Sequence, residues 1–74
     1  PPLSVRLLTL VQQIKKMQAY KGDHIAFLEA RKHTAWYMHG LKGAAELRRM
    51  CAGITNMEDV MEICRQAQKL NPAE

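Results

Sequence analysis

The sequence predicts an all-α protein, a small four-helix bundle formed by a single domain over residues 1–74. Three observations lead to this fold class. Apolar residues recur with the period of an amphipathic helix, about 3.6 residues; no segment alternates between apolar and polar residues as a half-buried strand would; and glycine or capping residues divide the chain at three places. A core built from 74 residues is marginally stable.

The first helix is expected from Leu3 to about Tyr20, after two prolines that suit a linker. Its core stripe consists of Leu3, Leu7, Leu10, Ile14 and Met17, with Val11 at the edge. Val5 and Leu8 lie well off this stripe. They are either ordinary surface apolar residues or a patch for something outside this chain.

Gly22 is expected to stop the first helix, and Asp23 to cap a second helix that runs to about His39. The apolar side of this helix carries Phe27, Leu28, Ala30, Thr34, Ala35, Met38 and Leu41, with Arg31 among them. The other side carries Glu29, Lys32, His33, Trp36 and Tyr37. Large aromatic side chains are usually buried, so either Trp36 packs on a neighbouring helix, which we favour, or this side of the helix meets a partner.

A turn bracketed by two glycines, with Lys42 at its tip, is expected to lead into a short third helix from about Ala44 to Ala52. The inner side of this helix carries Ala44, Leu47, Met50 and Cys51, and Arg48 flanks that side. The helix begins beside Lys42, where free backbone N–H groups and the positive end of the helix dipole would suit a phosphate. A cap without any ligand explains the same features.

A capping box of Thr55 and Glu58 is expected to start a fourth helix, which continues to about Leu70. Its apolar face is broad and carries Met57, Val60, Met61, Ile63, Cys64 and Ala67. Together, the inner stripes predict a core of Leu7, Leu10, Ile14, Met17, Phe27, Leu28, Met38, Leu47, Cys51, Val60 and Cys64.

The two cysteines, Cys51 and Cys64, are predicted to be core thiols. Each stands among apolar neighbours, and two cysteines are too few for a disulfide framework. A zinc site would need His33 and His39 as well, but six residues along a helix turn the side chain by about 240°, so these histidines point to different faces. We therefore expect no metal site.

Charge is distributed unevenly along the chain. Residues 1–49 carry nine cations and three acids (+6), whereas residues 50–74 carry two cations and four acids (−2), which sum to the net charge of +4. Five of the cations lie within residues 30–49, together with Trp36 and Tyr37. Cations attract phosphate and planar side chains stack on bases, so this composition favours RNA as a partner, although a solvated basic face would look similar.

Several classes of function are not expected. The sequence holds no serine near a suitable base and acid, no phosphate-cradling glycine motif and no carboxylate pair in its basic part, so we assign no catalytic residue and expect that the chain alone is not an enzyme. It also has no apolar run of membrane-spanning length and no signal-peptide pattern, which predicts a soluble, cytoplasmic protein.

The order of residues between about 20 and 49 is more specific than their composition. It includes Ala30-Arg31-Lys32-His33, Trp36-Tyr37, Gly40-Leu41 and Gly43-Ala44-Ala45-Glu46-Leu47-Arg48-Arg49. This order resembles the C-terminal helical domain of bacterial tRNA-dihydrouridine synthases. The resemblance implies a parent oxidoreductase whose TIM barrel holds flavin mononucleotide (FMN), takes reducing equivalents from NADPH and reduces uridine in tRNA. In that family a barrel cysteine donates a proton, a role that we give to neither Cys51 nor Cys64.

The chain has no barrel, so the resemblance implies that it is the tRNA-recognition domain alone, with no cofactor of its own. The RNA-binding residues that it implies are Arg31, Lys32, His33, Trp36, Tyr37, Lys42, Arg48 and Arg49. Trp36 and Tyr37 match the motif, and they either stack on RNA or support the basic residues from beneath. We further expect Val5 and Leu8 to contact the parent's catalytic barrel.

Two other functions stay open at this stage. One is a helical protein-interaction module in which the basic face is incidental and Val5 and Leu8 mark the interface. The other is a helix-turn-helix DNA-binding protein, which fits less well because the turn over residues 40–43 does not lead into a helix rich in base-reading side chains.

Overall fold

A computed structural model describes residues 2–72, which form three α-helices and no strand. The helices are α1 (Leu3–Tyr37), α2 (Ala44–Cys51) and α3 (Met57–Leu70). The all-α class is confirmed, whereas the four-helix bundle is not, because the first two predicted helices belong to one helical element. The first of the two prolines assigned to a linker, Pro1, lies outside the described residues.

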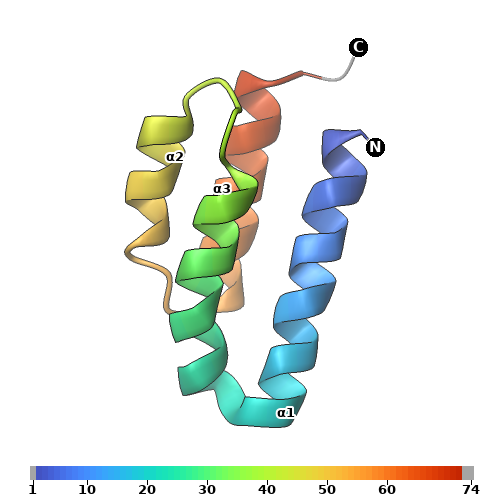
Figure 1. The fold of residues 1–74 in the computed structure, drawn as a ribbon, viewed down its shortest axis with the longest axis vertical. Coiled ribbons are helices and arrows are strands. Elements are labelled where there is room, and N and C mark those ends of the chain that lie inside the picture. The colour runs from blue at the N-terminus through green and yellow to red at the C-terminus, as the bar shows by residue number, and fades with distance from the viewer. Residues whose placement is uncertain (1, 73–74) are drawn as a thin grey trace.

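The long helix α1 folds back on itself as two arms, residues 3–21 and residues 23–37, that lie side by side in opposite directions (Figure 1). The bend is at Gly22, whose φ of 81° and ψ of 167° are not helical. The predicted break in the helix at Gly22 is thus present as a bend, and helical structure continues directly on both sides of it. Asp23, the predicted cap, accepts a hydrogen bond from Gln18 Nε2 across the bend (3.1 Å).

Side-chain contacts hold the two arms together. Lys21 Nζ forms an ion pair with Glu29 Oε2 at 3.1 Å, just beyond the bend. Nearer the open end of the hairpin, the Tyr37 hydroxyl donates to Gln13 Oε1 at 3.4 Å. Exposed pairs of this kind contribute little free energy of folding each, so the apolar contact between the arms remains the main source of their association.

The core lies where both arms of α1 meet α2 and α3. It contains Leu7, Leu10, Ile14, Phe27, Ala30, Met38, Leu47, Cys51, Ile54, Val60, Ile63, Cys64 and Ala67. The predicted core is therefore largely confirmed, with two corrections. Met17 is only partly buried, and Leu28 is 44% exposed. Met17 lies near the bend, which projects beyond α2 and α3 (Figure 1). Leu28 lies about 100° around the helix from the buried Phe27, at the edge of the core face.

The core also contains a loop residue that sequence periodicity did not identify. Ile54 is fully buried although it lies between α2 and α3, outside any helix. A single apolar residue in a loop has no periodic pattern around it. Only the packing of the loop against α1 shows that Ile54 is part of the core.

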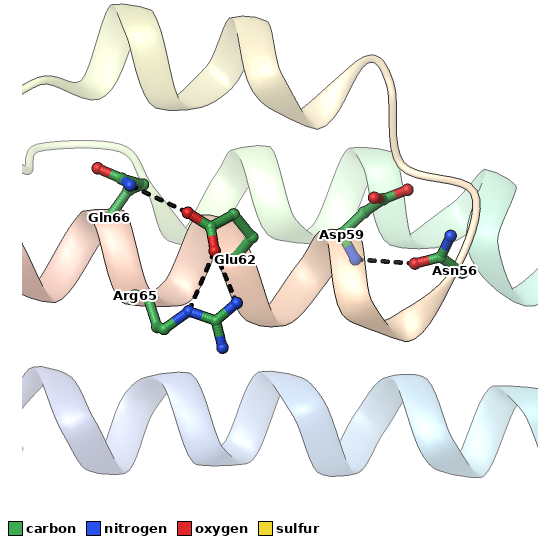
Figure 2. Close-up of polar contacts among 5 residues, drawn as sticks. All are labelled: Asn56, Asp59, Glu62, Arg65 and Gln66. Atoms are coloured by element: carbon green, nitrogen blue, oxygen red, sulfur yellow. Dashed lines mark hydrogen bonds and ion pairs between the residues drawn. The ribbon is translucent and has the colours of Figure 1, made fainter.

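The start of α3 differs by one residue from the predicted capping box. Its N-cap is Asn56, whose Oδ1 accepts a hydrogen bond from the backbone N–H of Asp59 at 2.9 Å (Figure 2). Asp59 in turn accepts hydrogen bonds from the backbone N–H (2.9 Å) and the hydroxyl (3.2 Å) of Thr55. The predicted pair of Thr55 and Glu58 is therefore wrong. The pairs Thr55–Glu58 and Asn56–Asp59 have the same spacing and overlap here. The aspartate side chain is shorter than that of glutamate, and its carboxylate reaches back to Thr55 at the start of the turn.

Asn71 connects the end of α3 to the turn before α2. Its Oδ1 accepts from the backbone N–H of Lys42 at 2.9 Å, and its Nδ2 donates to the carbonyls of Lys42 (3.2 Å) and Ala67 (2.9 Å). The predicted third helix is confirmed as α2, which ends at Cys51. Because both polar groups of the Lys42 backbone are bound, the position of this turn is defined by α3.

Cys51 and Cys64 are both free and buried, which confirms that they are core thiols. Burial raises the pKa of each thiol to about 11. Both are therefore protonated and uncharged at neutral pH. Separately, none of the helices within residues 2–72 combines the length and the apolar character needed to cross a membrane.

We predict that Gly22→Ala lowers the free energy of unfolding by about 1–3 kcal/mol, because the combination of φ and ψ at the bend is essentially restricted to glycine. An added Cβ would meet no atom within 4 Å, so the loss would come from backbone strain alone. Urea unfolding, monitored by circular dichroism, measures this change in the free energy of unfolding.

Gly53→Ala is the matched control for this substitution. Its φ lies outside the left-handed region, and an added Cβ would make only an ordinary contact of 3.7 Å with the carbonyl oxygen of Met50. Equal stability of the two variants would contradict the role assigned to the bend.

Candidate nucleic-acid interface

An open hollow lies on the surface between the second arm of α1 and α2. Its lining consists of Lys32, Ala35, Trp36, His39 and Arg48. The first four stand at positions i, i+3, i+4 and i+7, so they share one face of the second arm and the turn that follows it. Arg48 comes from α2. Arg48 joins Lys32, Trp36 and His39 around this hollow only because the two helical segments pack together.

Trp36 is exposed, contrary to the burial that we favoured from the sequence. Its exposed fraction is 73%. The second arm turns Ala30, Thr34 and Met38 into the core, and Trp36 lies on nearly the opposite side of the helix. The core face of this arm is thus complete without the indole.

Tyr37 occupies a different environment from its neighbour. It is partly buried, and its hydroxyl donates to Gln13 on the first arm. Its ring lies 6.2 Å from that of Trp36, at an interplanar angle of 75°. Tyr37 therefore supports the second arm and the base of the indole, while Trp36 faces solvent.

Arg31 is separated from the hollow although it is adjacent to Lys32 in sequence. It is partly buried, and its Nε donates to the carbonyl oxygen of Ile54 at 2.9 Å. Arg31 thereby ties the second arm of α1 to the loop between α2 and α3. This contact follows from its place on the apolar side of the helix, which the sequence already indicated.

The other three predicted cations or histidines lie outside the lining of the hollow. His33 is exposed on the second arm, and Lys42 is exposed in the turn whose backbone Asn71 holds. Arg49 Nη2 pairs with Glu46 Oε1 at 3.1 Å, and both side chains are more than half exposed. Such surface pairs are weak and leave the guanidinium available to a stronger anion.

His39 lines the hollow but was absent from the residues predicted from the sequence. It stands seven residues after Lys32 and three after Trp36, which places all three on one stripe of a helix. Its backbone N–H donates to the carbonyl of Trp36 at 3.1 Å, so helical geometry extends this far. This spacing is the signal that would have identified it.

Two backbone N–H groups at the phosphate position predicted for the start of α2 already have partners within the protein. The backbone N–H of Lys42 donates to Asn71, and that of Ala44 donates to the carbonyl of Leu41 at 3.2 Å. The turn thus satisfies these two groups internally, whereas its hydrogen bonds do not involve the N–H groups of Ala45 and Glu46 in the first turn of α2, so the structure does not decide between a cap and a phosphate position. Among the described residues, no group of three or more His, Cys, Asp or Glu side chains is placed to hold a metal ion.

Comparison with known proteins gives matches of two kinds, to a family model and to curated proteins. A family model described as dihydrouridine synthase (Dus) matches residues 1–72. A curated protein of Synechocystis sp., named "Probable tRNA-dihydrouridine synthase 1", is 31% identical over 67 residues, which cover 90% of this chain and 19% of that protein. The chain thus spans about a fifth of the length of this relative. No solved structure gives a significant match.

We predict that Arg31→Ala lowers the free energy of unfolding by about 1–3 kcal/mol, since it removes a charge-assisted hydrogen bond and the packing of the side-chain stem. Lys32→Ala, at the adjacent exposed position, should change it by no more than about 0.5 kcal/mol. Thermal unfolding of both variants tests the difference. A stable Arg31→Ala protein would show that its contact with Ile54 is dispensable.

Proposed function

Since the chain belongs to the dihydrouridine synthase family, we propose that it is the tRNA-recognition domain of a flavin-dependent tRNA-dihydrouridine synthase. In this proposal the parent enzyme reduces uridine to dihydrouridine in tRNA, and a separate TIM barrel carries the chemistry. The observation that supports the recognition role best is the convergence of Lys32, Arg48 and an exposed Trp36 around one hollow. A tRNA partner also implies that the protein acts in the cytoplasm.

The proposed binding surface extends from the hollow along the second arm and across α2. Lys32 and Arg48 would contact phosphates directly, and His33, Lys42 and Arg49 would contact the RNA on either side. Each phosphate neutralised by a cation releases bound counterions, which supplies a salt-dependent free energy of binding. Arg31 and Tyr37 would help indirectly, because their hydrogen bonds to Ile54 and Gln13 fix the second arm in place.

FMN and NADPH are proposed for the parent enzyme and not for this domain. The four principal hollows lined by the described residues are all open on the surface. A flavin needs an enclosed cleft that covers most of its ring system. The residues described here do not fit the cofactor, so we assign no step of the reduction to them.

Val5 and Leu8 carry a second part of the proposal. Their exposed fractions are 49% and 57%, as their position off the core stripe predicted. We propose that these two side chains contact the catalytic barrel of the parent. The same exposure is the observation that favours the alternative function, a helical protein-interaction module, so a test of this contact is needed in addition to a test of RNA binding.

We predict that the domain binds tRNA with an affinity that falls steeply as salt rises. Lys32→Ala, Arg48→Ala and Arg49→Ala should each lower the slope of log affinity against log salt by roughly one unit. His33→Ala should weaken binding with less change in slope, because an imidazole contributes to RNA binding mainly through hydrogen bonds. Titration of labelled tRNA at several salt concentrations measures both quantities.

Lys69→Ala is the internal control for these variants. Lys69 is exposed on α3, where it shares a hollow with Glu62 and Arg65, and its loss should leave the slope unchanged. The cation substitutions should weaken the binding of all tRNAs to the same extent, because phosphate contacts position RNA without reading its bases. Equal affinities for every variant, or tighter binding to duplex DNA than to tRNA, would contradict the proposal.

We predict that replacing Val5 and Leu8 together by serine leaves the stability of this chain within about 0.5 kcal/mol, since both side chains are exposed. In the full-length enzyme the same change should weaken the contact between this domain and the catalytic barrel. Small-angle scattering and limited proteolysis would detect the change in domain arrangement. Met61→Ser, at an apolar position on α3 with 41% exposure, is the control. An unchanged domain arrangement would rule out this contact.

A further inference from the structure

We propose that the hollow between the second arm of α1 and α2 holds one unpaired nucleotide, with its base stacked on Trp36 and its flanking phosphates bound by Lys32 and Arg48. This inference rests on the proposed function, which calls only for a basic surface that binds tRNA. It adds the form of RNA that the surface selects and the residue that selects it.

The exposure of Trp36 is the first step of the argument. The large indole of Trp36 is 73% exposed. It therefore contributes little of the apolar burial that stabilises a small domain. Its aromatic neighbour does not cover it by stacking, because the ring of Tyr37 stands nearly perpendicular to it at 75°. The indole is thus available to a planar ligand, and a nucleic-acid base is such a ligand.

The charge around Trp36 is the second step. Lys32 stands one turn before Trp36 on the same face, and Arg48 faces the hollow from α2. No acidic residue belongs to the lining, so these cations are not neutralised there. A planar surface beside two cations suits a base with its flanking phosphates better than it suits an apolar peptide, which would leave both cations without partners.

His39 adds polar recognition at the same place. An imidazole donates and accepts hydrogen bonds, so it can meet the edge of a base or a ribose 2′-hydroxyl. In duplex RNA the faces of the bases are stacked on one another and cannot reach the indole. The site should therefore prefer a nucleotide from a loop, a bulge or a single strand.

The other hollows lack this combination. The hollow beside Arg31 also contains Asp23, and the Arg31 Nε is bound to the loop. The hollow on α3 contains Glu62, which already pairs with Arg65. A further hollow, formed by the ends of α1 and α3, has no charged residue in its lining. An exposed aromatic ring with unpaired cations beside it occurs at one of these four places.

The test uses Trp36 as its own probe, because it is the only tryptophan of the chain. Titration with a short oligouridine should quench its fluorescence to saturation, and a blunt RNA duplex should quench it less. Trp36→Leu should weaken the binding of labelled oligouridine by roughly 5- to 150-fold, the effect of losing one stacked base. The slope of log affinity against log salt should not change, because no charge is lost. Trp36→Phe should retain most of the affinity.

Tyr20→Leu is the control, since Tyr20 is 89% exposed at the bend and does not line the hollow. Circular dichroism of each variant verifies folding. If tRNA binding depends on Lys32 and Arg48 but Trp36→Leu binds oligouridine like the wild type, the nucleotide site is overturned and the proposed function stands. Tighter binding to the duplex than to oligouridine would also overturn it. If neither tRNA nor oligouridine binds, both proposals fail.

Discussion

The reversal of the chain at Gly22 is the constraint on which the rest of the structure depends. Its φ of 81° and ψ of 167° turn one long helix into a hairpin and bring the apolar stripe of each arm toward the other. Leu10 and Ile14 from the first arm and Met38 from the second then belong to one core. Neither α2 nor α3 is long enough to form a core alone, so both depend on packing against α1.

This arrangement also decides which face of the second arm is exposed. Once Ala30 and Thr34 of the second arm face the core, the residues on the opposite side must face solvent. Trp36 is therefore exposed as a direct consequence of the packing on the other side of the helix. The position of α2 then places Arg48 beside this face, and the hydrogen bonds of Asn71 hold the turn that joins the two helices.

The electrostatics of α3 complement this picture. Glu62 accepts hydrogen bonds from Gln66 at 3.0 Å and from Arg65 at 2.6 Å (Figure 2). These hydrogen bonds, together with the charge of Arg65, lower the pKa of the Glu62 carboxyl. The carboxylate thus offsets the charge of Arg65 locally. On α3 the cations have acids beside them, whereas the hollow beside α2 has cations without acids, so a polyanion would be directed to the latter.

The sequence by itself determined the helical class, the break in the helix at Gly22, most of the core and the family resemblance, because amphipathic period, glycine turns and motif order are local properties. Only the tertiary structure decided that Arg31 binds Ile54 while its neighbour Lys32 faces the hollow, that Trp36 is exposed and that His39 joins the site. The physical reason is that a side chain's surroundings depend on which other segments cover its face of the helix. Contacts between residues far apart in the chain decide which segments cover a given face, and a local sequence pattern does not contain this information.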